Sequence, residues 1–327
     1  MFILCNNEKT IAEVVQFLNQ TSCVFLDCEG RDLGTRNGAL SIISLGSLHS
    51  ETIYLVDVVS LSPDLLQPVF DLLGNENLRK VVWDGRMDFS ELFFGHATAI
   101  DANVLDLQLV DITSRAARGE NEYKRNHRLC SGFPWREVRK LQLEDLHALC
   151  SLDRALREHD VANVAQKDVN VKKAHASNST EIWMQRPLTD ELLAYAAGDI
   201  ERITALYEHF LKTGYLEDAL LPDLLSQSAR YVGFFRSIGR PSDENRFWRS
   251  ALLPLGILQA TGEELQVCGG CKRALSKACY PLPLQETNRN DQEDQLPYCR
   301  VCTFISAKFE FRARAVAIEE IAKNVVV

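Results

Sequence analysis

The chain of 327 residues has room for one large domain and a smaller one, and its content of 46% hydrophobic and 25% charged residues is ordinary for a globular protein. The formal net charge of −9 argues against a protein that binds nucleic acid over its whole surface, but it fits a site rich in carboxylates. No apolar run approaches a membrane span, and the first residues lack the basic start of a signal peptide. We therefore expect an intracellular protein of the cytoplasm or nucleus, without membrane contact and with reduced cysteines.

The first third of the chain predicts three antiparallel strands followed by alternating strands and helices. Runs rich in Ile, Val and Tyr predict strands, and apolar residues at helical spacing predict helices. The expected strands are 25–30, 38–47, 52–58, 80–83 and 103–107, and the expected helices are 10–19, 62–74, one from 86 and one from 108. Strands that alternate with helices call for parallel additions to a sheet. This order is that of a ribonuclease H-like α/β fold, a mixed sheet flanked by helices.

The segment 114–140 differs in composition from its surroundings. Eight Lys or Arg residues stand there against three Glu, with three aromatic residues among them, and the segment shows little periodicity. It is typical of a basic insertion or long loop. Two interpretations remain open: a solvated loop, or a nucleic-acid contact through Lys124, Arg125 and Arg128, because cations among aromatic residues suit phosphates and stacked bases.

A long helix is expected over 189–210, with Thr189 as its N-cap and a continuous apolar stripe. Tyr195 and Asp199 stand four residues apart, so they are neighbours on one face of this helix. A further helical stretch runs to about Val232, and 238–247 is expected to be a linker.

Two carboxylates end the first of the three strands. Asp27 and Glu29 are separated by one residue, so they project from the same face, with Cys28 turned the other way. Carboxylates held so close repel each other unless a cation lies between them. A strand that runs into a polar turn is the alternative interpretation of this pair alone.

Three motifs in order resemble those of the DEDD 3′–5′ exonucleases that carry a tyrosine. The stretch FLDCEG is similar to their first motif, VVWDGRMDFSEL to their second with Asp88 ahead of Leu92, and YAAGD to their third. The stretches VLDLQLVD and WMQRPLTDEL resemble the ribonuclease D branch. The resemblance covers roughly Ile11 to Leu211, and its ordered combination is more specific than any single motif.

The resemblance implies hydrolysis of phosphodiester bonds from the 3′ end with two Mg²⁺ or Mn²⁺ ions, a mechanism that explains the carboxylates. It implies that Asp27 bridges both ions and that Glu29 and Asp199 hold the ion carrying the attacking water. It further implies that Asp88 holds the second ion through water and that Tyr195 orients the attacking water.

Two departures bear on this assignment. Asp84 stands just before Asp88, where many relatives have an uncharged residue, and it could share the metal-binding role of Asp88. Ser44 occupies a place where ribonuclease D-like chains often have Gln. Single-stranded 3′ ends are the expected partner, RNA rather than DNA because of the WMQRPL stretch. The alternative is a catalytically silent nucleic-acid-binding adaptor on the same fold.

A second cluster of residues predicts a structural zinc site. Two Cys-x-x-Cys pairs supply four thiolates, the set that tetrahedral Zn²⁺ prefers, and they leave no position open for water. The ligands are Cys268, Cys271, Cys299 and Cys302, while the spacing of Cys279 makes it a spare. Whether this module binds nucleic acid or a protein partner stays open, as does the possibility that partner docking is its main function.

These features divide the chain into three expected parts. An exonuclease domain spans 1–214 and includes the basic insertion at about 114–140. A helical extension and linker span 215–262, and a small four-cysteine zinc module spans 263–327.

Overall fold

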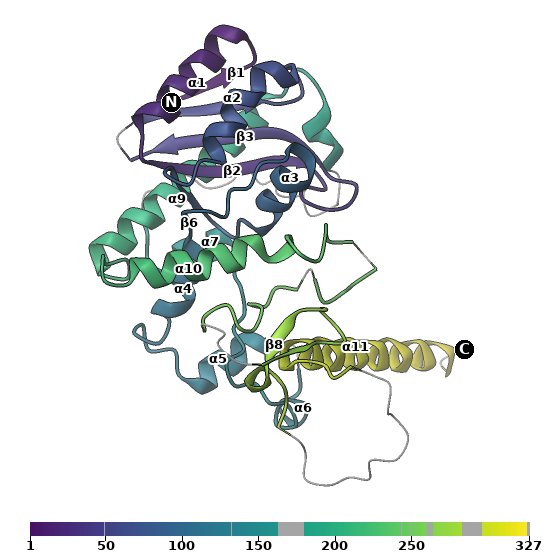
Figure 1. Cartoon of the computed structure of the whole chain (residues 1–327). Helices are drawn as coiled ribbons and strands as arrows, with labels where there is room; N and C mark the ends of the chain where they lie inside the picture. The colour runs from purple at the N-terminus through teal and green to yellow at the C-terminus, as the bar shows by residue number, and fades with distance from the viewer. Residues whose placement is uncertain are drawn as a thin grey trace. The chain divides into compact units, whose positions relative to one another are not determined.

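The computed structural model describes residues 1–48, 50–131, 133–162, 180–242, 244–248, 250–259, 264–282 and 296–325. The chain divides into two compact units, each built from two segments: unit 1 is 1–115 with 150–241, and unit 2 is 116–149 with 242–327. The structure thus groups the segment after 115 with the cysteine-rich end of the chain (Figure 1). Among the described residues, no helix is long and apolar enough to span a membrane.

Unit 1 is built on a six-stranded mixed sheet in the order β1-β4-β3-β2-β5-β6. The antiparallel pairs are β2–β3 and β3–β4, and the parallel pairs are β1–β4, β2–β5 and β5–β6. The strands are β1 (Phe2–Cys5), β2 (Cys23–Arg31), β3 (Ala39–Ser47), β4 (Ser50–Asp57), β5 (Arg79–Val82) and β6 (Val104–Asp106). The antiparallel meander and the parallel additions are confirmed. The edge strand β1 was not predicted, because four residues are too short to show a period.

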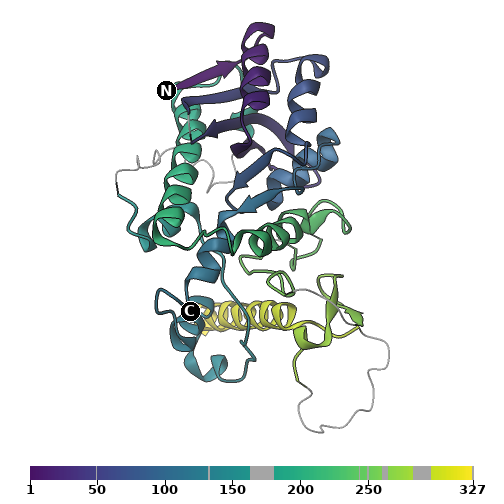
Figure 2. The same ribbon diagram turned by 60° about the vertical axis from the view of Figure 1, so that its left-hand side comes forward.

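Helices cover both faces of this sheet. Figure 2 shows α9 on one side and α1, α2 and α3 on the other. The helices of unit 1 are α1 (Glu8–Gln20), α2 (Pro63–Leu73), α3 (Arg86–His96), α4 (Leu107–Ser114), α7 (Leu152–Glu158), α9 (Asp190–Thr213) and α10 (Leu221–Val232), with the 3₁₀ turns η1 (Thr180–Met184) and η2 (Gly233–Phe235). The apolar stripe of α9 packs into a core with Phe25 of β2 and Leu55 of β4. The expected N-cap is present, since the Thr189 side chain accepts from the Leu192 N–H.

Close packing of α9 on the sheet depends on a glycine. A Cβ added to Gly46 of β3 would lie 2.6 Å from Cγ2 of Ile200, so any side chain here would push the helix away. Ile200 directly follows Asp199, so this contact sets how near that carboxylate lies to the strands.

Unit 2 has its own core, made of residues from both of its segments. Its elements are α5 (Glu122–Leu129), α6 (Trp135–Val138), β7 (Leu265–Val267), β8 (Ala274–Ser276), η3 (Lys277–Cys279) and α11 (Arg300–Val325). Leu129, Val138 and Leu146 are buried in one cluster with the cysteines of the later segment, and Phe133 stacks on Phe304 and Phe311 of α11. The α5–α6 segment accordingly lies beside α11 (Figure 2). Of the two expectations for 114–140, the long loop is wrong, because the segment forms two short helices whose Leu129 and Val138 are buried in this core, whereas 116–149 does interrupt unit 1 as an insertion would.

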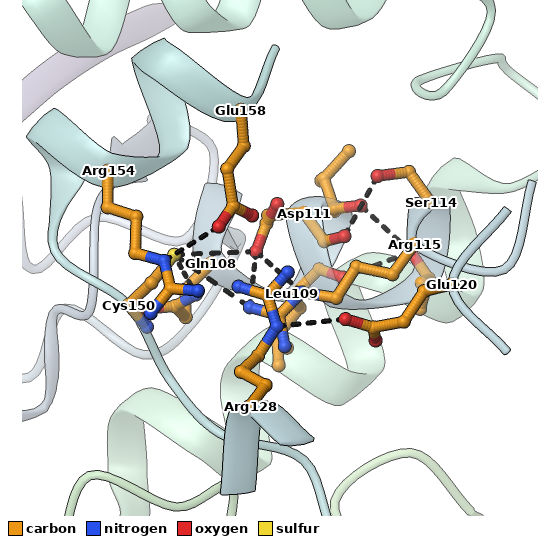
Figure 3. Close-up of polar contacts among 12 residues, drawn as sticks. Gln108, Leu109, Asp111, Ser114, Arg115, Glu120, Arg128, Cys150, Arg154 and Glu158 are labelled. Atoms are coloured by element: carbon orange, nitrogen blue, oxygen red, sulfur yellow. Dashed lines mark hydrogen bonds and ion pairs between the residues drawn. The ribbon is translucent and has the colours of Figure 1, made fainter. Parts of the chain in front are cut away.

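The chain leaves unit 1 after Arg115 and re-enters it at Cys150, and a buried polar cluster joins these two points (Figure 3). The carboxylate of Asp111 accepts from the Arg115 guanidinium at 2.7 Å and lies 3.0 Å from Nε2 of His159. Gln108 accepts from the Cys150 N–H at 3.3 Å. Asp111 is fully buried and Arg115 only 2% exposed, so neither group can be hydrated if its partner is removed.

Candidate active site

Three carboxylates converge at the centre of unit 1. One oxygen each from Asp27, Glu29 and Asp199 lies within 4.8 Å of the others. Asp27 is half-buried, and Glu29 and Asp199 are buried. Three such groups repel one another at close range, so the arrangement is one that a divalent cation would stabilise.

Local backbone geometry presents the first two carboxylates together. Asp27 and Glu29 lie on β2, and the register with β3 shifts between Glu29 and Gly30. Such a bulge re-aims a side chain at the end of a strand. The third carboxylate, Asp199, arrives from the middle of α9, a helix packed on the same sheet.

Asp88 lies beside this trio and not among the converging atoms. It is in the first turn of α3, and its Oδ1 accepts from the Cys28 N–H at 2.9 Å. The pairing of β2 with β5 ends at Phe25, so Asp88 satisfies a strand N–H beyond that point. Burial raises the pKa of the Asp88 carboxyl to about 7, against the opposing effect of its backbone hydrogen bonds. A nearby cation would favour its charged form.

A buried arginine, Arg202, contacts Asp199 of the carboxylate trio from one turn further along α9. Nη1 of Arg202 lies 3.3 Å from Oδ1 of Asp199, and its Nε lies 3.8 Å from Asp153 on α7. Arg202 is 3% exposed, and its guanidinium passes 2.9 Å from the place where a Cβ of residue 198 would stand. Gly198 thus leaves room for the arginine, which fixes one oxygen of Asp199 through a charge-assisted bond.

Tyr195 is placed by the segment that precedes α9. Its ring lies 6.1 Å from that of Trp183, which is fully buried. The Trp183 carbonyl accepts from Nη1 of Arg186 at 2.8 Å, and Nε of Arg186 donates to Asp57 of β4 at 2.8 Å. The WMQRPL stretch is therefore attached to the sheet by an ion pair and supports the tyrosine by packing.

Asp84 belongs to a different set of contacts. Its carboxylate pairs with the Arg86 guanidinium at 2.6 and 3.0 Å and accepts from the Tyr231 hydroxyl at 2.8 Å. Asp84 takes a positive φ of 53°, and its N–H is bound by Asp106. These contacts hold the turn before α3 and leave Asp84 outside the converging carboxylates.

We expect the substitutions Asp84→Asn and Asp88→Asn to act on different properties. Asp84→Asn leaves the buried Arg86 without its charge partner, so it should lower the free energy of unfolding by about 1–3 kcal/mol, a range that allows for the partial exposure of Asp84. If the chain cleaves phosphodiester bonds as its motifs imply, Asp88→Asn should reduce the cleavage rate about a hundredfold or more. Thermal unfolding and single-turnover rates, both measured below the unfolding transition, separate the two. An equal loss of rate in both variants would show that the second motif is wrongly assigned.

The four predicted zinc ligands also converge. The sulfur atoms of Cys268, Cys271, Cys299 and Cys302 lie within 4.8 Å of one another, and all four residues are buried. The Cys299 N–H donates to the Cys268 sulfur at 3.2 Å. A Cβ on Gly270 would lie 2.8 Å from the Cys302 sulfur, so the first pair needs a glycine there. Cys279 is buried but lies outside the cluster, with its sulfur 3.6 Å from the Ser276 hydroxyl.

The three predicted nucleic-acid contacts differ in their surroundings. Arg128 pairs with Glu120 at 2.8 Å, with side chains only 13% and 10% exposed (Figure 3). Lys124 is exposed and donates to the Gly119 carbonyl, and Arg125 is half-buried. Of the three, Lys124 has the most accessible charge, and Arg128 is the one most engaged inside its own unit.

Both residue sets fit the ions expected from the sequence. Carboxylate oxygens are the preferred ligands of Mg²⁺ and Mn²⁺, and a buried set of four thiolates is the preferred ligand set of structural Zn²⁺. The acidic and cysteine clusters are thus the groups of the described residues that could hold a metal ion.

Sequence reasoning missed several residues that shape the site. Arg202 carries no motif signal, and the Arg186–Asp57 pair joins positions far apart in the chain. Ser44, noted only as a departure, lies directly opposite Asp27 in the β2–β3 register, and its buried hydroxyl has no hydrogen-bond partner among the described residues. This pairing depends on the cross-strand register, which the sequence does not give.

Comparisons with known proteins fit this geometry. Residues 2–111 match the family model described as 3'-5' exonuclease. No curated protein sequence matches the chain.

Solved structures show the fold. The crystal structure of Trypanosoma brucei RNase D is similar with a TM-score of 0.56 and 21% identity, over 75% of this chain and 76% of that chain. Its complex with RNA U12 gives a TM-score of 0.54 and 22% identity, over 75% of this chain and 74% of that chain. The GMP complex gives a TM-score of 0.55 and 21% identity, over 75% of this chain and 67% of that chain. The fold of the chain is therefore RNase D-like.

Proposed function

We propose that the chain, whose residues 2–111 match a 3′–5′ exonuclease family model, is a metal-dependent 3′–5′ exonuclease acting on nucleic acid, with RNA preferred over DNA. The observation that carries the proposal is the convergence of Asp27, Glu29 and Asp199, with Asp88 bonded to the residue between the first two. These four carboxylates and Tyr195 come from three separate motifs, in the order that such a site requires.

Each residue has a task in this reaction. Asp27, Glu29 and Asp199 would hold divalent cations, with Asp88 beside them, and such ions supply an activated water and a stabilised leaving oxygen. The Tyr195 hydroxyl would accept or donate a hydrogen bond to orient the attacking water. Arg202 holds Asp199 by one oxygen, which fixes the direction of the other. This positioning role belongs to the chain whether or not an ion is bound.

Support for an RNA substrate comes from the relatives. The similar RNase D has been solved with RNA U12 and with GMP, a ribonucleoside monophosphate. The WMQRPL segment that resembles the same branch is built into unit 1, where Arg186 bonds Asp57 and Trp183 packs near Tyr195.

The test of the function uses the full chain with Mg²⁺ or Mn²⁺ on 5′-labelled single-stranded RNA and DNA of one sequence. We expect 3′ shortening by one nucleotide at a time, release of nucleoside 5′-monophosphates, and faster loss of RNA. Tyr195→Phe removes only the hydroxyl, so it should slow cleavage at least tenfold while binding is retained. Tyr54→Phe, a half-buried tyrosine on β4 of the same unit, is the matched control. Binding without any cleavage would support the silent adaptor instead.

The basic segment offers a separate prediction. If Lys124, Arg125 and Arg128 neutralise substrate phosphates, the triple alanine variant should bind more weakly and its affinity should fall less steeply with salt. Because Arg128 is paired with Glu120, we expect most of the change from Lys124→Ala and Arg125→Ala alone. Titrations between about 50 and 200 mM salt measure the slope. An unchanged slope would show that these three cations do not contact the substrate.

A further inference from the structure

The two units differ strongly in charge. Unit 1 carries 18 Lys or Arg residues against 29 Asp or Glu, whereas unit 2 carries 18 against 16. The overall charge of −9 therefore hides a unit without the acidic excess that would repel nucleic acid.

Unit 2 carries a row of rings and a guanidinium, which we call the ring ladder: Tyr298, Phe247, Arg246 and Phe309. The Tyr298 and Phe247 rings meet edge to face with centroids 5.2 Å apart. The Arg246 guanidinium lies 5.0 Å from the Phe247 centroid and 4.8 Å from the Phe309 centroid. Its Nη2 also donates to the Ser306 hydroxyl at 3.2 Å. The charge is therefore held in one place between two rings.

The ladder remains accessible although its members contact one another. Tyr298 is 40% exposed and Phe309 is 52% exposed, and Arg246 is also exposed. A half-exposed ring beside a fixed guanidinium offers a stacking face and a positive charge together. Proteins that bind single-stranded nucleic acid use this combination, because every base has a π-face and every phosphodiester linkage carries a negative charge.

More cations lie along the helix that supplies Phe309. Lys308 stands over the Phe304 ring at 5.8 Å, and Arg312 is exposed one turn further along α11. Burial and the neighbouring Arg312 charge lower the pKa of the Lys308 ammonium, as expected where two cations share one helix face. A phosphate near this pair would relieve their repulsion.

The ladder is attached to the first cysteine pair. Nδ2 of Asn245 donates to the Gly270 carbonyl at 3.0 Å, and Nε1 of Trp248 donates to the Cys271 carbonyl at 3.2 Å. Phe247 lies between these two anchors and packs against the core of unit 2. The cysteine cluster therefore fixes the backbone that carries Arg246.

We propose that the ring ladder, with Lys308 and Arg312, is a second binding surface for single-stranded nucleic acid, separate from the carboxylate site and dependent on the cysteine cluster. Bases stack on Tyr298 and Phe309, and Arg246 and the helix cations neutralise the backbone. A protein partner is less well matched: aromatic residues and arginine also occur at protein interfaces, but lysine is depleted there, and Lys308 with Arg312 suits a polyanion.

The test measures binding apart from cleavage. The full chain with Asp27→Asn is titrated against fluorescein-labelled single-stranded U30 and dT30 oligonucleotides by anisotropy at several salt concentrations. Arg246→Ala with Phe309→Ala should weaken binding roughly tenfold or more and flatten the salt dependence. The matched control, Lys277→Ala with Leu265→Ala, removes one exposed cation and one exposed apolar side chain elsewhere in unit 2 and should change affinity less than about twofold.

Two further variants keep the test decisive. Phe309→Ala alone removes a half-exposed ring with little risk to folding, and Arg246→Lys keeps the charge but loses the planar stack; both should weaken binding by an intermediate amount. With Asp27 restored, the ladder variant should cleave a dinucleotide at the parent rate. A failure of the ladder proposal can therefore be distinguished from a failure of the proposed nuclease activity. Ladder variants that bind U30 and dT30 within twofold of the parent would overturn the proposal and leave the surface to a protein partner.

Discussion

Asp27→Asn should abolish 3′ trimming, with a rate loss of about a thousandfold or more. Asp27 is one of the three converging carboxylates, and an amide in its place would lack the anionic oxygen that divalent cations prefer. The measurement is the single-turnover rate on end-labelled RNA with saturating Mn²⁺. A second readout does not depend on activity: added Mn²⁺ should raise the unfolding midpoint of the parent chain but leave that of Asp27→Asn nearly unchanged.

The control is Asp64→Asn, which removes the same charge from an exposed position in the first turn of α2. It should keep both the rate and the Mn²⁺-induced shift. If Asp27→Asn retained more than a tenth of the parent rate, the carboxylate trio would not be the reaction centre. If it lost activity but kept the shift, the ion would be held mainly by Glu29, Asp88 and Asp199.

Cys302→Ser should remove the metal from unit 2 and unfold that unit while unit 1 stays folded. The apparent binding free energy of a structural zinc is roughly 10–16 kcal/mol, which is comparable to the whole stability of a small domain. Because 116–149 shares its core with the cysteines, both 116–149 and the segment after 264 should become protease-sensitive together. Elemental analysis should find about one zinc per parent chain and none in the variant.

Cys279→Ser is the matched control, since this cysteine is buried in the same unit but lies outside the cluster. It should keep its zinc and its protease resistance, with a loss of at most about 1–2 kcal/mol in the free energy of unfolding. A Cys302→Ser chain that still binds one zinc, or that shields 116–149 from protease, would contradict the four-thiolate assignment.

The sequence predicted those features that depend on neighbours in the chain. Strand alternation placed Asp27 and Glu29 on one face, helical spacing placed Tyr195 beside Asp199, and paired cysteines indicated a four-sulfur cluster, which the structure brings together. The ribonuclease H-like sheet followed from the order of strands and helices, and its topology confirms that prediction.

Features that depend on distant partners were out of reach. The α5–α6 segment was expected to be a basic insertion or long loop because its composition is basic and it shows little periodicity, and the packing partners of its apolar residues lie more than a hundred residues later. The role of Arg202 could not be predicted for the same reason, since this arginine pairs with Asp153 on another helix as well as with Asp199 on its own. The hydrophobic periodicity of a segment does not show which distant segments it will contact in the fold.

The interleaving of the two units has a consequence for how the protein is made. During synthesis, the first half of the unit 2 core emerges from the ribosome roughly 150 residues before Cys302, which packs in the same core. This first half consists of Leu129, Val138 and Leu146. At a synthesis rate of about 5–20 residues per second, these side chains stay without their packing partners for on the order of ten seconds. Throughout that interval they are open to chaperones, to proteases and to other nascent chains. A metal ion held by the four cysteines could not shorten this interval, because Cys299 and Cys302 emerge only roughly 150 residues after Leu146.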